Sequence, residues 1–194
     1  TENIYKELKD RLIEEADYLN EFKNMLIYKS IFKNNKNIIV PSPFRNLSTD
    51  KLLTMEWLEG EALNKFYSSN KVIRNRIAEN LFNAWYYPFY KFGIIHGDPH
   101  PGNYTIANDG KCLNLLDFGC IRIFNPNFVG GVIRLYKALL NDNKDEAAKA
   151  YKSWGFTNLN SDLVNALNVW ALYLYGPLLE DKIRKIQDHE GAAY

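Results

Sequence analysis

Three side chains that carry oxygen ligands occur close together in the sequence. Asp98 and Asn103 lie in the segment HGDPHPGN, and Asp117 opens the triplet Asp-Phe-Gly after a short apolar stretch. Transfer of a phosphoryl group from a nucleotide needs an acidic group facing the acceptor and oxygen ligands for Mg²⁺. Carboxylate and amide oxygens are suitable ligands for that hard cation. The residue types and their spacing therefore predict a site for ATP and Mg²⁺, in which Asn103 and Asp117 hold the metal.

The order of these residues is more specific than any one of them. The pattern HxDxxxxN followed by DFG is the protein-kinase order of base, second metal ligand and first metal ligand. Asp98 is therefore expected to be the catalytic acidic residue, with its acid group facing the acceptor hydroxyl or water. His96 begins the pattern and is expected to be one of the catalytic residues. Its expected role is to support the loop as a buried, hydrogen-bonded strut.

A zinc site is an alternative interpretation of the same segment. His96, Asp98 and His100 alternate along it, and alternating ligands on a short stretch can bind zinc. The only other histidine is His189, near the C-terminal end, so the magnesium interpretation is favoured. His100 is expected to fix the loop or to contact phosphate.

Hydrophobic periodicity and turn residues predict the elements that position these side chains. Helices are expected at residues 2–35, 61–67, 72–92, 128–140, 144–154, 162–175 and 179–188. Strands are expected at 38–40 and 52–58, forming one hairpin, and at 104–107 and 112–116, forming a second hairpin around Asp109-Gly110. Glycines and prolines predict an irregular loop at 94–103, a helix stop at Gly93, a kink or restart at Pro88 and a break at Gly176-Pro177.

Composition and charge exclude several classes of protein. The chain has 194 residues, 46% of them hydrophobic, and 24 Lys plus Arg balance 23 Asp plus Glu. A disordered chain and a strongly basic nucleic-acid binder are therefore excluded. No apolar stretch approaches the roughly 18 residues needed to span a bilayer. Two cysteines, Cys112 and Cys120, cannot form a disulfide framework, which favours a reducing compartment.

The segments HGDPHPGN and LLDFG, with EEADYLNE and LTMEWLEG upstream, resemble those of the UbiB-like atypical kinases, also called the ABC1/ADCK family. The resemblance implies a protein-kinase-like fold, binding of adenine nucleotide with Mg²⁺, ATPase activity and a link to ubiquinone biosynthesis. It also implies quinone-biosynthesis proteins and isoprenoid lipids at a membrane surface as partners. The implied location is intracellular: cytoplasmic or peripheral on the inner membrane, and in a eukaryote the mitochondrial matrix or a plastid.

The resemblance also assigns roles to residues of the first helix. Glu15 and Asp17 match the ExD motif of the family, and Glu21 matches the helix-C glutamate that normally pairs with a nucleotide-binding lysine. On a helix, Asp17 and Glu21 share a face and Glu15 points nearly opposite, so the two ends of ExD are expected to play different roles. The alternative is a solvated acidic face.

The segment Met55, Glu56, Trp57 and Leu58 falls where the hinge of a kinase is expected. In such a segment, backbone N–H and C=O groups pair with the adenine edge, so the identity of the side chains matters less.

Other parts of the family pattern are missing. The first glycine is Gly60, and no Gly-rich or Ala-rich phosphate loop, strand lysine or KxGQ motif precedes the ExD helix. The chain begins at Thr1, so we expect a fragment that lacks most of the N-terminal lobe and binds ATP poorly; a degenerate pseudokinase is the other explanation.

The expected fold class is α+β, mainly helical. Residues 1–58 are expected to form a partial N-terminal lobe with the ExD helix, hairpin and hinge, and residues 59–194 a helical kinase-like C-terminal lobe. The favoured function is an atypical kinase or ATPase that supports ubiquinone biosynthesis. A small-molecule phosphotransferase of the aminoglycoside or choline kinase type and a non-catalytic scaffold are the alternatives. Neither a nucleic-acid partner nor a transmembrane span is expected.

Overall fold

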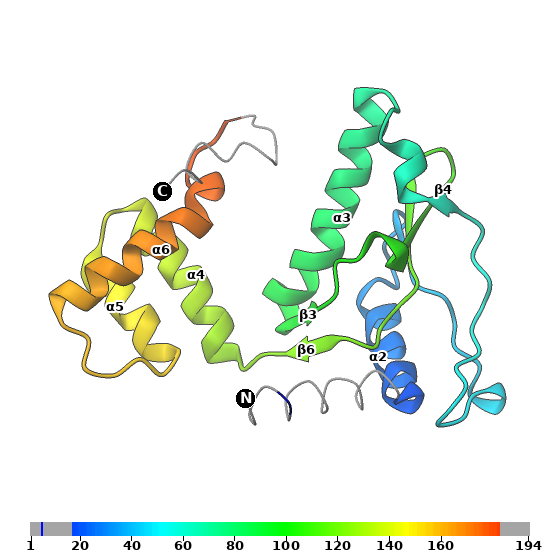
Figure 1. Cartoon of the computed structure of the whole chain (residues 1–194), viewed down its shortest axis with the longest axis horizontal. Coiled ribbons are helices and arrows are strands. Elements are labelled where there is room, and N and C mark those ends of the chain that lie inside the picture. Colours follow the sequence, from blue (N-terminus) through cyan, green and yellow to red (C-terminus); the bar gives the residue numbers. More distant parts are fainter. Residues whose placement is uncertain (1–4, 6–16, 183–194) are drawn as a thin grey trace. The chain divides into compact units, whose positions relative to one another are not determined.

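The computed structural model describes Tyr5 and residues 17–182 of the chain (Figure 1). The chain divides into two compact units, residues 1–123 and residues 124–194. Among the described residues, the first unit combines helices α2 and α3 with short strands, and the second is helical. The mainly helical α+β class expected from the sequence is therefore confirmed.

A mixed four-stranded sheet organises the first unit. Its order is β1 (Ile38–Ile39), β5 (Cys112–Leu115), β4 (Tyr104–Ala107) and β2 (Glu61–Ala62). Strand β1 runs parallel to β5, and the β4–β5 and β2–β4 pairs are antiparallel. A second, two-stranded sheet pairs β3 (Ile94–His96) with β6 (Ile121–Ile123) in antiparallel register, so that His96 faces Ile121. The two short strands therefore bring the HGD and DFG segments side by side.

Two capped helices pack against these strands (Figure 1). Helix α2 (Tyr18–Ile31) begins at Asp17, whose side chain accepts a hydrogen bond from the Asn20 N–H. Helix α3 (Lys71–Phe92) begins at Asn70 and ends at Gly93, which has a left-handed φ of 70°. The predicted stop at Gly93 is confirmed. Pro88 lies inside α3, so the helix does not restart there.

The core of the first unit surrounds the DFG segment. Met25 and Tyr28 of α2, Leu113 of β5 and Phe118 are all fully buried. The ring of Tyr28 lies 5.4 Å from that of Phe118. Burial of these large side chains contributes roughly 2 kcal/mol each, so the DFG phenylalanine is part of the core that holds α2 in place.

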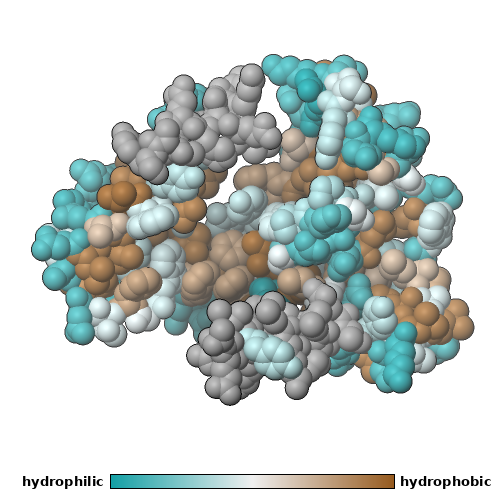
Figure 2. Space-filling view, viewed as in Figure 1, coloured by the Kyte–Doolittle hydropathy of each residue, from teal (hydrophilic) through white to brown (hydrophobic). Residues whose placement is uncertain are grey.

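Within residues 124–182, the second unit contains the helices α4 (Pro126–Leu140), α5 (Lys144–Ser153) and α6 (Ser161–Leu179). They enclose a separate core built around Leu135, Ala150 and Tyr151. Hydrophobic side chains also lie at the surface of this unit, and on α6 they include Val169, Trp170 and Leu174 (Figure 2). None of the helices in the described part of the chain is long and apolar enough to cross a membrane.

The structure confirms one predicted hairpin and corrects the other. Strands β4 and β5 form the hairpin expected around Asp109-Gly110, with positive φ at Asn108, Asp109 and Gly110. The expected pairing of 38–40 with 52–58 is wrong, because β1 pairs with β5 instead. Residues 43–55 contribute two isolated bridges, Pro43–Met55 and Thr49–Leu52. The first is flanked by hydrogen bonds from the Phe44 N–H to the Thr54 carbonyl and from the Glu56 N–H to the Ser42 carbonyl.

Other expected elements differ in detail. Residues 94–103 are not wholly irregular, since they contain β3 and a 3₁₀ turn at Pro101–Asn103 (η3). The expected helix at 61–67 is strand β2 followed by a 3₁₀ turn at Leu63–Phe66 (η2); another such turn spans Arg45–Leu47 (η1). Helix α6 continues through Gly176-Pro177, and Pro177 lies in its last turn. Residues 180–182 are not helical, and the rest of the expected final helix lies outside the described residues.

The boundary between the two compact units falls after residue 123. Strand β2, just beyond residue 58, pairs with β4 and joins the same sheet as β1. The segments on both sides of residue 58 therefore belong to one compact unit, and the assignment of residues 1–58 and 59–194 to two kinase lobes stays a prediction.

Candidate active site

His96 connects the two segments that carry the candidate catalytic residues. Its Nε2 atom lies 2.7 Å from the Asp117 carbonyl oxygen, and the Asp98 N–H donates to Nδ1 over 3.1 Å. A carbonyl only accepts and an amide N–H only donates, so the ring is the neutral tautomer protonated at Nε2. The ring is 2% exposed and has four aromatic neighbours at centroid distances of 6.2–6.5 Å: Tyr28, Trp85, Tyr104 and Phe118. The expected buried strut is confirmed.

Asp98 and Asn103 form a direct pair. The Asn103 Nδ2 atom donates to Asp98 Oδ2 over 2.8 Å, and the His100 N–H donates to Asp98 Oδ1 over 3.0 Å. The Leu116 N–H donates to the Asn103 carbonyl, which fastens the loop to the end of β5. Because Asn103 uses its amide nitrogen for Asp98, its ligand atom Oδ1 lies on the other side of the amide group.

Asp117 is oriented by its own turn. The Gly119 N–H donates to Asp117 Oδ1 over 2.8 Å, while the Asp117 carbonyl accepts from His96. Burial raises the pKa of the nearby Tyr104, a hydrogen bond from Trp85 opposes this, and the charges of Asp98 and Asp117 raise the pKa further. Both carboxylates therefore lie within electrostatic reach of one phenol.

Helix α2 holds the DFG segment through two side chains. Glu21 Oε1 accepts from the Phe118 N–H over 3.2 Å, and Asn24 Nδ2 donates to the Phe118 carbonyl over 2.9 Å. Burial raises the pKa of Glu21, the bond from Phe118 opposes this, and the charge of Asp117 adds to the increase. Glu21 was predicted from the sequence as a site residue, but Asn24 was missed. Its position three residues after Glu21 on one helical face was the available signal.

Of the two ExD residues, Asp17 can be placed, and it lies at the start of α2. Asp17 is exposed, and its side chain caps α2 by accepting from the Asn20 N–H. Because Asp17 is the N-cap rather than a residue of the helix, the expected common face with Glu21 does not describe its role. Glu15 lies outside the described residues.

The predicted hinge segment is anchored at both ends. Glu56 Oε2 accepts from the N–H and the hydroxyl of Ser42, and these bonds lower the pKa of Glu56. Trp57 is 82% exposed and donates to Glu59. Asn114, buried in β5, donates to the Glu59 carbonyl over 3.1 Å. These bonds fix the path of the segment, and the Glu56 N–H adds to them by donating to the Ser42 carbonyl over 2.8 Å.

A family model described as the ABC1 atypical kinase-like domain matches residues 1–151, more than half of the chain. The chain belongs to this family. The family resemblance found in the motifs is thereby confirmed.

Curated relatives agree with the ABC1 assignment. An aarF domain-containing protein kinase of Arabidopsis thaliana, named as chloroplastic, is 32% identical over 154 residues, which is 79% of this chain and 21% of the relative. AarF domain-containing protein kinase 1 of Gallus gallus is 30% identical over 162 residues, 80% of this chain and 31% of the relative. The chain thus spans about a fifth to a third of the length of these relatives.

A solved structure shows the same fold. The erythromycin complex of Rv3197 from Mycobacterium tuberculosis superposes with a TM-score of 0.62 at 20% identity, covering 94% of this chain and 50% of the other. At this identity the similarity concerns the fold alone. It confirms the expected kinase-like fold for the ABC1 chain.

The donors of the site fit magnesium better than zinc. Both ring nitrogens of His96 are engaged in hydrogen bonds, and His100 Nδ1 accepts from the Gly102 N–H. Within the described residues, no group of three His, Cys, Asp or Glu side chains is arranged to hold a metal ion. The described residues therefore do not favour the zinc interpretation. The remaining donors, Asn103 Oδ1 and the Asp117 carboxylate, are the hard oxygens that Mg²⁺ prefers.

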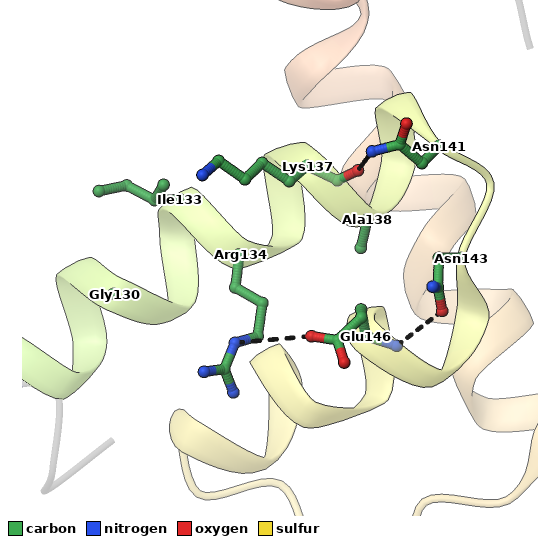
Figure 3. A pocket seen from close by; sticks show the side chains of 8 residues that line it. All are labelled: Gly130, Ile133, Arg134, Lys137, Ala138, Asn141, Asn143 and Glu146. Carbon is green, nitrogen blue, oxygen red and sulfur yellow. Dashed lines mark hydrogen bonds and ion pairs between the residues drawn. The ribbon is translucent and has the colours of Figure 1, made fainter.

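A separate pocket of about 410 Å³ lies in the second unit and contains none of these residues (Figure 3). Arg134 extends from α4 toward Glu146 of α5, with 3.8 Å between Nε and Oε2 (Figure 3). Lys149 also contacts Glu146, over 2.6 Å. The carboxylate is thus shared by two cations of the same unit.

Proposed function

We propose that this ABC1 chain carries the magnesium and catalytic residues of an ATP-dependent phosphotransferase or ATPase. The observation that carries the proposal is the single ring of His96, which hydrogen-bonds the backbone of Asp98 and of Asp117. Asn103 and Asp117 would hold Mg²⁺. When bound, this ion neutralises the charge that develops between the phosphates of ATP.

Asp98 is suited to face the acceptor. Its two oxygens accept from the Asn103 amide and from the His100 N–H, and these bonds fix the orientation of the carboxylate. A fixed carboxylate can orient an acceptor hydroxyl or a water molecule and accept its proton. In this proposal Asn103 has two roles, because it positions Asp98 through Nδ2 and offers Oδ1 to the metal.

The remaining assignments complete the nucleotide site. Backbone groups of Met55, Glu56, Trp57 and Leu58 would pair with the adenine edge. Glu15 and Asp17 would act as the ExD motif. Glu21 would support the site from α2. Since the first glycine of the chain is Gly60, we propose that this chain alone binds ATP more weakly than micromolar.

The biological role follows from the family. We propose support of ubiquinone or another isoprenoid quinone pathway, with quinone-biosynthesis proteins and isoprenoid lipids at a membrane surface as partners. The chloroplastic relative supports a plastid location; the mitochondrial matrix or a bacterial inner membrane are the corresponding locations in other hosts. The chain spans only about a fifth to a third of the length of these relatives, so the role in a quinone pathway stays a proposal.

The test is ATP hydrolysis by the chain at millimolar MgATP, with and without phenolic quinone precursors. We expect the chain to release phosphate and the phenolic quinone precursors to stimulate this release. Asp98→Asn should lower the release about 100-fold, which is the usual contribution of a general base. Stoichiometric transfer to a small alcohol would instead indicate an aminoglycoside or choline kinase type of phosphotransferase. Equal phosphate release by the wild type and the variant would contradict the assignment of Asp98 and favour a non-catalytic scaffold.

A further inference from the structure

Asn24 contacts the DFG segment at a point that controls the orientation of Asp117. We propose that Asn24 is a positioning residue, which sets the direction of the Asp117 carboxylate for the metal through the peptide group between Phe118 and Gly119. The inference rests on the proposed magnesium role of Asp117. It adds a residue that none of the motifs of the site contains.

The hydrogen bonds on the two peptide groups of the DFG turn carry the argument. In the first group, the Asp117 carbonyl accepts from His96 and the Phe118 N–H donates to Glu21. In the second group, the Phe118 carbonyl accepts from Asn24. The N–H of that same second group belongs to Gly119 and donates to Asp117 Oδ1 over 2.8 Å. Each peptide plane is therefore held at both of its ends.

The planarity of the peptide links Asn24 to the carboxylate. A trans peptide is rigid, and its C=O and N–H point in nearly opposite directions. When Asn24 holds the Phe118 carbonyl over 2.9 Å, it also fixes the direction of the Gly119 N–H. That N–H holds one oxygen of Asp117, which directs the other oxygen toward the proposed metal. Rotation of this one plane would turn the carboxylate away.

The surroundings of Asn24 explain why an amide is needed. Asn24 is 8% exposed and Phe118 is fully buried, so the carbonyl depends on a protein donor there. An aspartate would place a negative charge beside a carbonyl oxygen, close to Glu21. A leucine has a similar branched shape but no donor, so Asn24→Leu removes the hydrogen bond.

The chain supplies a matched control for this substitution. Asn80 of α3 is 4% exposed and also donates through Nδ2 to a backbone carbonyl, that of Lys111, over 3.0 Å. Lys111 lies in the β4–β5 turn rather than in the DFG turn. Asn80→Leu therefore removes a bond of the same kind and burial without touching the peptide between Phe118 and Gly119.

The experiment compares the two leucine variants of the 194-residue chain by two measurements. The first is the ¹⁵N–¹H resonance of Gly119, which reports the bond to Asp117 Oδ1 without any metal. We expect it to shift in Asn24→Leu and to stay in place in Asn80→Leu. The second is Mn²⁺ binding in the presence of ATP, which we expect to weaken about 10-fold in Asn24→Leu alone, as for other supporting residues of metal sites.

The outcomes separate this inference from the proposed function. An unshifted Gly119 resonance in folded Asn24→Leu would overturn the inference, as would equal Mn²⁺ affinity in both leucine variants. Absence of Mn²⁺ binding by the wild type would overturn the proposed function, and with it the metal role, whatever the Gly119 resonance shows. Asn24→Asp serves as a second variant: it keeps the size but loses the donor, so it must reproduce the shift at neutral pH.

Discussion

At the scale of single residues, His96 does most to hold the site together. One ring accepts from Asp98 and donates to Asp117, and four aromatic side chains surround it. Removing it would leave a cavity as well as an unpaired buried carbonyl. The strut role was predictable from the sequence because HxD precedes a rigid loop; the donor and acceptor roles needed the geometry.

We therefore expect His96→Ala to lower the free energy of unfolding by about 3 kcal/mol, from the lost packing and hydrogen bonds together. Urea denaturation measures this. His100→Ala is the control, because His100 is exposed and bonds mainly within its own turn. An equal loss in both variants would contradict the special role of His96.

Glu21 predicts a dependence of stability on pH. Its pKa in the fold is raised above 4.5 by burial, so the folded state disfavours the charged form. Below the unfolded pKa the carboxyl is neutral in both states and costs nothing; as the pH rises through the folded pKa, the penalty reaches its full value. Glu21→Gln keeps an acceptor for Phe118 and has no charge. We therefore expect the variant to be more stable than the wild type at pH 7, with the gain vanishing below about pH 4.

Glu56 serves as a control, because its replacement by glutamine should change stability in the opposite direction. The bonds from Ser42 lower its pKa, so its contribution to stability is present above 4.5 and disappears as the pH falls through the lowered pKa. Glu56→Gln should therefore be slightly less stable than the wild type at pH 7 and equal to it in acid. Denaturation curves of both variants at two pH values measure the differences. A Glu21→Gln variant that is less stable at pH 7 would contradict the effect of burial.

At the scale of elements, local sequence patterns predicted the structure correctly where a turn fixes the register. The β4–β5 hairpin and the end of α3 at Gly93 were both predictable, because positive φ angles require residues such as Asn, Asp and Gly. The parallel pairing of β1 with β5 was not predictable, because the two strands are far apart in the sequence. Asn24 was missed for the same reason: its partner Phe118 is 94 residues away.

The end of α3 provides a test of this local reasoning. Gly93 has a φ of 70°, so Gly93→Ala should cost about 1 kcal/mol of stability. Gly130 lies inside α4 with nothing within 4 Å of an added Cβ, so Gly130→Ala should instead stabilise by up to about 1 kcal/mol. Thermal unfolding of both variants gives the signs. A change in stability of the same sign in both variants would contradict the left-handed cap at Gly93.

At the scale of the whole molecule, the chain has two separate hydrophobic cores, and the candidate site belongs to the first. The fold class and the family were predictable because the motifs HGDPHPGN and LLDFG lie on either side of a recognisable hairpin. The division into compact units was not predictable from the sequence. It depends on β2 joining the sheet of β1, β5 and β4, which no local pattern indicates.

Two core substitutions test the independence of the cores. Leu135 in the second core is 1% exposed, and Leu113 in the first is fully buried. Each Leu→Ala change should cost about 3 kcal/mol in its own core. We expect Leu135→Ala to leave Mn²⁺ binding by the first unit unchanged and Leu113→Ala to weaken it. Titration with Mn²⁺ below the unfolding temperature measures this, and equal weakening in both would show that the cores are coupled.

The central claim is that Asp98, Asn103 and Asp117 form one magnesium–nucleotide site. The most direct measurement is Mn²⁺ binding by electron paramagnetic resonance at millimolar ATP, for the wild type, Asp117→Asn and Asp109→Asn. Asp109 is the control, because it lies in the β4–β5 turn with a φ of 54°, which asparagine adopts readily. We predict at least a roughly 10-fold loss of Mn²⁺ affinity in Asp117→Asn and none in Asp109→Asn. Equal Mn²⁺ binding by all three proteins would contradict the claim.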